Sequence, residues 1–266
     1  MKQARGLNFA ITLSVIFAAV MMILPNAVII PASFNGENYI TFPPTSLSTR
    51  WYETFLTDPV WRGATWNSLV VAVLTAMVAT VLGTLAALGL MRLSVRARSL
   101  LVSLFLLPTI VPTIISAVAL YGLLAQMGGR GGLLGIIIGH TIITLPFVVV
   151  NVVAALQQMD VRMEHAARSL GASPLRAFWH VTLPVIWPGI AAGAVFAFLC
   201  SFSEIVMSLF LSGAGSMTLP VQMWSGIRFE INPTVAAASS VFVVLSCAIV
   251  ALMGFLRRKQ GKAMKS

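Results

Sequence analysis

The sequence predicts an all-α membrane protein with six transmembrane helices, and two observations lead to that prediction. Of the 266 residues, 58% are hydrophobic and only 9% are charged, whereas soluble domains carry about 25% charged residues. The apolar residues are gathered into six runs that reach the roughly 20 residues a helix needs to cross a bilayer. The predicted spans are 9–31, 67–91, 100–126, 133–156, 186–212 and 235–256.

The basic residues between these runs predict how the helices are oriented. Thirteen of the 17 lysines and arginines lie before the first span or after the second, fourth and sixth, and four lie in the other connections. Basic residues accumulate on the cytoplasmic side of membrane proteins. Both termini are therefore predicted to be cytoplasmic, as an even number of spans allows. The net charge of +10 has this origin, and no basic stripe with stacking aromatics indicates nucleic-acid binding.

The first run resembles a secretory signal because Lys2 and Arg5 precede it. Its length exceeds the roughly 7–15 residues of a signal core, and it lacks a clear small-residue cleavage site. We therefore expect an uncleaved first helix. The segment 32–66 that follows contains Trp51 and Tyr52, whose rings suit the headgroup level of a membrane, and a short interfacial helix is expected near 51–57.

Small residues and prolines predict how the helices pack and bend. Lipid provides no hydrophobic drive between helices, so contacts depend on small residues that let backbones approach, and we expect these contacts within the chain more than at a dimer face. The small residues at four-residue spacing are Ala79, Gly83 and Ala87 in the second span, Gly135 and Gly139 in the fourth, and Gly189 and Gly193 in the fifth. Pro108 and Pro112 are expected to bend the third span, and Pro146 could bend the fourth.

The connection 157–185 between the fourth and fifth spans, called here the coupling loop, predicts two short helices at a sharp angle. Asp160 is a suitable N-cap for the first helix. Its apolar face at helical spacing consists of Met163, Ala166, Ala167 and Leu170. Gly171 supplies a left-handed turn, Ser173 caps a second helix with Pro174 at its first position, and Pro184 is expected to end that helix. Such a compact apolar knob with a basic rim would fit a groove on a partner.

The spacing of residues in this loop resembles the EAA loop of binding-protein-dependent ABC importer permeases. That pattern reads Glu-Ala-Ala, three residues, Gly, nine residues, Ile-x-Leu-Pro, and the spacing here matches throughout. His165 stands at the Glu position and Val181 at the Ile position. Glu164 lies one residue early, about 100° around the helix, so the usual acidic contact is either redirected or missing. The resemblance implies that the residues coupling to an ATPase are Glu164, His165, Ala166, Ala167, Arg168, Gly171, Leu183 and Pro184.

The resemblance extends from Arg50 to about Ser240, and over this length the sequence is similar to the spermidine/putrescine-type permeases. The segments that carry it are Arg50-Trp51-Tyr52, Asn67-Ser68-Leu69, Leu145-Pro146-Phe147-Val148-Val149-Val150, Ser201-Phe202-Ser203-Glu204 and Leu219-Pro220-Val221-Gln222-Met223-Trp224. It implies a single permease domain over 1–266, multi-pass in the bacterial inner membrane, that forms the path for a small solute such as a polyamine or related amine. Permeases for opines and some amino-acid derivatives look alike.

The resemblance also implies partner chains. These are a paralogous permease subunit in a heterodimer, two copies of an ATPase, and an external substrate-binding protein. ATP and Mg²⁺ would bind to the ATPase, because this chain has no G-x-x-x-x-G-K-[ST] motif, and we expect no cofactor in this chain. It is predicted to be a transport subunit and not an enzyme.

Glu204 is the one formally charged side chain inside the six predicted spans. It is expected midway along the fifth span, beside Ser203. An ionised carboxylate in the bilayer is costly unless it is paired or hydrated. Glu204 is therefore either a counter-charge for a cationic substrate, with Ser203 on the same path, or a protonated or paired structural residue. His140 and Asn151 in the fourth span are expected to form helix-contact hydrogen bonds.

Two other classes of function compete with an ATP-driven importer. An ATP-independent secondary transporter or channel would need intramembrane charge pairs for ion coupling, and Glu204 alone does not form one. It would also leave the coupling loop unexplained. A membrane-embedded enzyme would need a catalytic constellation, which three histidines and the isolated Cys200 and Cys247 do not supply.

Overall fold

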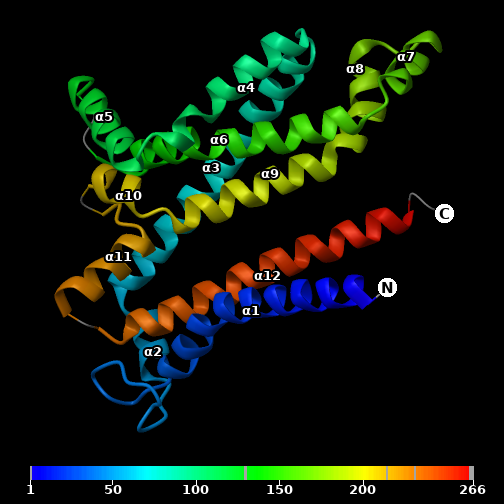
Figure 1. Ribbon diagram of the computed structural model, residues 1–266. Coiled ribbons are helices and arrows are strands. Elements are labelled where there is room, and N and C mark those ends of the chain that lie inside the picture. Colours follow the sequence, from blue (N-terminus) through cyan, green and yellow to red (C-terminus); the bar gives the residue numbers. More distant parts are fainter. Residues whose placement is uncertain (1, 129–130, 214, 231, 264–266) are drawn as a thin grey trace. The chain divides into compact units, whose positions relative to one another are not determined.

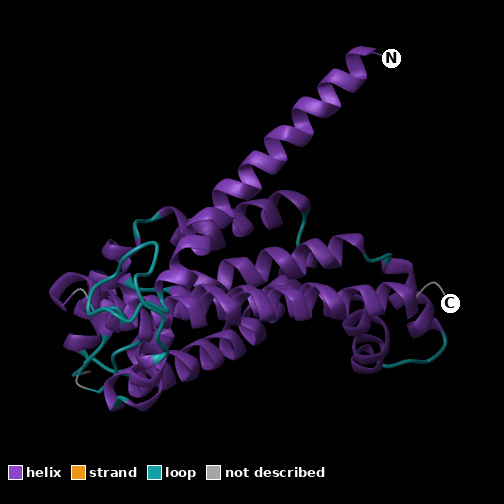
Figure 2. Cartoon of the chain, turned by 90° about the horizontal axis from the view of Figure 1, so that it is seen from below, coloured by secondary structure: helices purple, strands orange, loops and turns teal. Residues whose placement is uncertain are grey.

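The computed structural model describes residues 2–128, 131–213, 215–230 and 232–263. Within these ranges every regular element is a helix, and the connections are turns and loops (Figure 2). Two compact units make up the chain: residues 1–62 with 223–250, and residues 63–222 with 251–266. Five helices in the described part are long and apolar enough to cross a membrane, or six if one sharply bent pair counts as a single span.

The first unit contains α1 (Lys2–Ala32), α2 (Arg50–Thr57) and much of α12 (Thr234–Ala263). The apolar parts of the two long helices, 11–32 and 234–255, agree with the first and sixth predicted spans. Helix α2 confirms the short helix expected near 51–57. Two hydrogen bonds tie it to the end of α1 and the residues that follow: Trp51 Nε1 donates to the Asn35 carbonyl at 2.8 Å, and the Tyr52 and Ser33 hydroxyls lie 2.6 Å apart.

The second unit contains the elements from α3 to the start of α11. Their bounds are α3 (Pro59–Met91), α4 (Val95–Ile110), α5 (Thr113–Gln126), α6 (Leu133–Gln158), α7 (Val161–Ser169), α8 (Pro174–Ala177), the π-helix η1 (Phe178–Thr182), α9 (Leu183–Ser203), α10 (Val206–Leu211) and α11 (Leu219–Ser225); a second π-helix, η2 (Gly226–Glu230), follows in the first unit. Helices α6 and α9 run side by side (Figure 1). Buried aliphatic residues of α3, α6 and α9 form one core, which includes Val148, Val152 and Ile186.

Small residues lie where the helices of this unit approach most closely. A Cβ atom on Gly189 would lie 2.6 Å from Ala155 Cβ, and one on Gly193 would lie 3.0 Å from Val148 Cα. A Cβ on Gly83 of α3 would lie 2.7 Å from Val148 Cγ1. The distances at Gly189 and Gly83 are shorter than real Cβ contacts, and the distance at Gly193 is tighter than most, so a side chain at any of these sites would push its neighbours away. The expected packing within the chain through small residues is confirmed.

The third predicted span is two helices and not one. Helix α4 begins at Val95 and ends at Ile110, α5 begins at Thr113, and the two axes are bent by 91°. Pro112 stands at the N-cap of α5, where its missing N–H cannot continue the hydrogen bonds of α4. The bend expected from the prolines is confirmed, and it is sharp enough to divide the span 100–126 into two helices. Pro146 lies inside α6, which continues through it.

The fifth predicted span is also interrupted, at Glu204. Helix α9 ends at Ser203, Glu204 has extended backbone angles, and α10 begins two residues later. Side chains satisfy backbone groups that the break would leave unpaired. The Ser203 hydroxyl donates to the Cys200 carbonyl at 3.2 Å, and the Glu204 carboxylate accepts from the Met207 N–H at 2.9 Å. The expectation that Glu204 lies midway along a continuous helix is therefore wrong, because serine and glutamate side chains compete here for the helical hydrogen bonds.

Candidate coupling and translocation sites

The coupling loop has the two short helices that its sequence predicts. Asp160 caps α7, with its carboxylate accepting from the Arg162 N–H at 2.9 Å. Ser173 caps α8, with its hydroxyl accepting from the Arg176 N–H at 3.3 Å, and Pro174 is the first residue of that helix. Both predicted caps are confirmed. They could be predicted because capping depends on residues only two or three positions apart in the chain.

Gly171 makes the turn between these helices. Its φ of +92° is a backbone conformation that residues with a side chain rarely adopt. The Gly171 N–H donates to the Arg168 carbonyl at 3.0 Å, and the Ala172 N–H donates to the Ala167 carbonyl at 3.1 Å. These bonds pair carbonyls that the end of α7 would leave open, as in the usual left-handed helix termination.

The apolar side chains of the loop are exposed. Leu170 is 90% exposed and Trp179 57%, and Met163 and Leu175 are exposed as well. His165, Ala166 and Arg168 are also exposed, whereas Ala167 is half-buried. Several large exposed apolar residues on one short segment are typical of a surface that contacts another protein.

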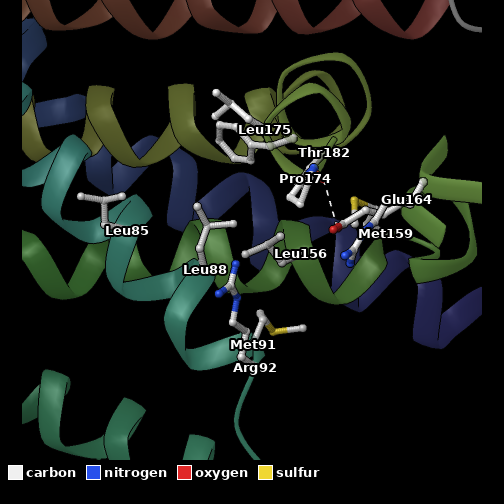
Figure 3. A pocket seen from close by; sticks show the side chains of 12 residues that line it. Leu85, Leu88, Met91, Arg92, Leu156, Met159, Glu164, Pro174, Leu175 and Thr182 are labelled. Atoms are coloured by element: carbon white, nitrogen blue, oxygen red, sulfur yellow. Dashed lines mark hydrogen bonds between the residues drawn. The ribbon is translucent and has the colours of Figure 1, made fainter. Parts of the chain in front are cut away.

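Glu164 points away from that exposed surface. It is half-buried, and its Oε2 accepts a hydrogen bond from the Thr182 hydroxyl at 3.3 Å, as the dashed line in Figure 3 shows. Two side chains could replace the family's acidic contact, the Glu164 carboxylate and the His165 imidazole, and they differ in position. His165 is exposed, whereas Glu164 joins α7 to the turn before α9. Within this chain, the Glu164 carboxylate thus contacts Thr182 and not the exposed surface of the loop.

A cavity of about 830 Å³ lies between the loop and the ends of α3 and α6 (Figure 3). Its wall is mainly apolar, with Arg92, Glu164 and Arg168 as the charged residues. The apolar part is formed by Leu85, Leu88, Met91, Leu156, Met159, Pro174, Leu175 and Phe178. The Glu164–Thr182 hydrogen bond therefore lies within the loop and joins α7 to η1 beside this cavity.

Pro184 does not end the second loop helix, contrary to the sequence prediction. The backbone passes from α8 through η1 into α9, and Pro184 lies in the first turn of α9. In η1 the Leu183 N–H donates to the Phe178 carbonyl, five residues back. This wider turn changes the carbonyl arrangement ahead of Pro184, where an α-helical turn would place a clashing carbonyl. Leu183 is half-buried and Pro184 is exposed.

The break at Glu204 places two polar side chains where neither is fully buried. Ser203 is exposed within this chain and Glu204 is half-buried. One carboxylate oxygen accepts from the first turn of α10. A carboxylate fixed at a break in a membrane helix can face a cavity, because interrupted helices are tolerated where they line a path through the protein.

His140 of α6 forms the helix-contact hydrogen bonds that its position predicts. Its Nδ1 lies 2.8 Å from the Ser201 Oγ of α9, and its Nε2 lies 3.1 Å from the Ser208 Oγ of α10. These two partners could not be predicted from the sequence, because they lie on opposite sides of a break that hydropathy does not detect. Asn151, for which an interhelical bond was also expected, donates to the Phe147 carbonyl of its own helix at 2.8 Å.

The long apolar helices, the exposed loop between two of them and the polar break in the bundle define a polytopic membrane transport subunit. Residues 79–262 match the family described as "Binding-protein-dependent transport system inner membrane component". The chain belongs to this family.

Two curated relatives have sequences similar to most of the chain. The spermidine/putrescine transport system permease protein PotC of Escherichia coli (strain K12) is 31% identical over 240 residues, which are 90% of each chain. The putrescine transport system permease protein PotI of the same organism is 31% identical over 239 residues, which are 87% of this chain and 83% of PotI.

Solved structures of ABC transporters share the fold. A bacterial transporter involved in the import of alginate has a TM-score of 0.74 at 16% identity and covers 97% of this chain and 96% of its own. A bacterial alginate ABC transporter in complex with an alginate pentasaccharide-bound periplasmic protein has a TM-score of 0.72 at 17% identity, with the same coverage. The MetNI methionine transporter has a TM-score of 0.63 at 21% identity and covers 76% and 98%.

Family membership assigns the general role. The chain is an inner-membrane permease subunit of an ABC importer and not an enzyme. This removes the ATP-independent transporter as an alternative. Among the described residues, no group of three or more His, Cys, Asp or Glu side chains could hold a metal ion.

Proposed function

We propose that the chain forms part of the translocation path of an ABC importer for putrescine, spermidine or a related amine. The relatives PotC and PotI carry polyamine names over nearly the whole length of the match. The observation that carries the proposal is Glu204, the one charged side chain of the predicted spans, held half-buried at a helix break. A carboxylate in a low-dielectric environment attracts an amine and disfavours an anion.

The proposed topology has six spans, both termini in the cytoplasm and one permease domain over residues 1–266. In it, α4 and α5 together form the third span, and α9 and α10 together form the fifth. The distribution of lysines and arginines supports this orientation, because the coupling loop and both termini then lie on the side that holds 13 of the 17 basic residues.

The proposed assembly contains a paralogous permease, two ATPase subunits that bind ATP and Mg²⁺, and an external binding protein. The exposed apolar surface of the coupling loop supports docking to the ATPase. Closure of the ATPase pair would then move α7 and α8, and through them α9. Within the loop, Gly171 sets the turn and Glu164 joins α7 to η1, while His165, Ala166, Ala167, Arg168, Leu183 and Pro184 complete the proposed coupling set.

The substitution Glu204→Gln tests the substrate class. Glutamine keeps an oxygen that can accept from the Met207 N–H, so the helix break should persist while the charge is lost. We expect uptake of radiolabelled putrescine or spermidine into proteoliposomes to fall several-fold, with complex yield and basal ATP hydrolysis largely unchanged. Unchanged uptake would refute the counter-charge role. If neither polyamine is taken up by the wild-type complex, the polyamine assignment is wrong.

A further inference from the structure

A buried imidazole joins the two helices on either side of the Glu204 break. His140 is 1% exposed, and its two ring nitrogens are within hydrogen-bond distance of Ser201 Oγ, three residues before Glu204, and Ser208 Oγ, four residues after it. Both serines are also buried. A serine hydroxyl can donate or accept, so either neutral tautomer of the ring can satisfy both partners.

The same part of α6 supports the first turn of α10. A Cβ atom on Gly139 would lie 3.2 Å from Met207 Sδ and 2.9 Å from Leu211 Cδ1, so α10 packs directly on the backbone beside His140. Met207 is the residue whose N–H donates to the Glu204 carboxylate. The position of the carboxylate thus depends on the position of α10, and α10 is held by α6.

We propose that His140 is a positioning residue for substrate recognition: by tying α9 to α10 across the break, it fixes the Glu204 carboxylate in the orientation that binds the amine. The proposal rests on the proposed function of Glu204. It assigns His140 no contact with substrate. Its consequence is that loss of the tie to α10 weakens substrate recognition through Glu204 and through no other group.

A double-mutant cycle tests this dependence, because residues that act independently give additive effects and coupled residues do not. The first variant is Ser208→Ala, which removes the hydrogen bond between His140 and α10. The second is His140→Phe, which removes the hydrogen bonds to both α9 and α10. Each is made with and without Glu204→Gln. His140→Gln is the conservative variant, since its amide keeps a hydrogen-bonding group near the position of Nε2. Thr141→Val is the matched control: the Thr141 hydroxyl donates to the Ile137 carbonyl of its own helix at 2.7 Å and takes no part in the break.

The complete importer, with its partner permease, ATPase and binding protein, is reconstituted in proteoliposomes. The KM and the maximal rate are measured for whichever of putrescine and spermidine the wild type transports. We expect Ser208→Ala and His140→Phe to raise the KM several-fold and His140→Gln to restore most of it. Thr141→Val should leave the KM unchanged. In the Glu204→Gln background, the first two substitutions should change the KM little further.

The outcomes separate this inference from the proposed function. If Glu204→Gln alone leaves uptake unchanged, the proposed function of Glu204 fails and the inference fails with it. If Glu204→Gln lowers uptake but the other two substitutions reduce only the amount of assembled complex, His140 is merely structural and the inference is overturned. Equal KM effects with and without the Glu204 charge would overturn it too. Should His140→Phe not assemble, the cycle with Ser208→Ala gives the decision by itself.

Discussion

Gly189 is the point at which α9 approaches the backbone of α6, and replacing it with alanine should separate the two helices. A Cβ atom there would lie 2.6 Å from Ala155 Cβ and 2.9 Å from the Asn151 carbonyl oxygen. One of these neighbours is backbone and the other is a methyl group fixed to it, so neither can rotate away. The helices themselves must move apart by several tenths of an ångström, and the buried contacts around Val148 and Ile190 would loosen.

The size of the effect follows from two opposing contributions. Forcing one extra methyl group into a well-packed interior costs about 1–3 kcal/mol. Alanine in place of glycine within a helix recovers about 0.5–1 kcal/mol. We therefore expect Gly189→Ala to destabilise the fold by about 1 kcal/mol, the difference between the midpoints of those ranges. At roughly 2–4 °C per kcal/mol for a chain of this size, the Tm should fall by several degrees.

Thermal unfolding of the purified complex in detergent measures this change. Gly122→Ala in α5 is the control, since a Cβ there has nothing of this chain within 4 Å, and it should not lower the Tm. Ala155→Gly removes the nearest atom, so the double variant with Gly189→Ala should lose less stability than the two single effects add up to. A Gly189→Ala protein as stable as the wild type, or strictly additive single effects, would refute the close-approach argument.

Three further predictions concern the coupling loop and the topology. Gly171→Val forces a β-branched residue into a left-handed turn at a cost of about 1–2 kcal/mol, so transport and stimulation of ATP hydrolysis should be lost while the protein still inserts. The control Gly171→Asn should retain both activities. Copurification of the valine variant with a fully coupled ATPase would contradict this prediction. Asp160→Ala removes the N-cap of α7, which is worth about 0.5–2 kcal/mol, and should weaken ATPase coupling measured in proteoliposomes. Asp160→Asn is the control, because asparagine keeps the cap. Undiminished coupling in the alanine variant would count against the role of α7. A reporter fused after Ser266 should read cytoplasmic and one inserted near Asn35 external, and a cytoplasmic reading at Asn35 would overturn the placement of the first helix.

Local signals explain what the sequence predicted well. The caps at Asp160 and Ser173 and the turn at Gly171 depend on neighbours a few residues away, and the structure has all three. The positions of close helix contacts at Gly189 and Gly193 were predicted from glycine spacing for a similar reason, because a missing side chain is visible in the sequence; which helix they contact was not predicted. The exposed apolar surface of the loop was predicted from the helical spacing of its apolar residues, such as Met163 and Leu170.

The breaks in the third and fifth spans could not be predicted in the same way. Hydropathy measures the length of an apolar run, and it is the same for one continuous helix and for two helices joined at an angle. Glu204 sits in such a run, and only the competition of its carboxylate for the Met207 N–H reveals that the helix stops. The hydrogen-bond partners of His140 could not be predicted either, since they lie 61 and 68 residues away in the chain.

The π-helical turn at Phe178–Thr182 sets the angular phase between the coupling loop and Glu204. A π-turn accommodates one residue more than an α-turn, and each residue of an α-helix advances by about 100°. Every side chain of α9, up to its end at Ser203, is therefore rotated by about one residue step from where an uninterrupted helix from α8 would put it. Deleting a single residue from this turn would leave the loop surface and the polar break chemically intact but would face them in different directions.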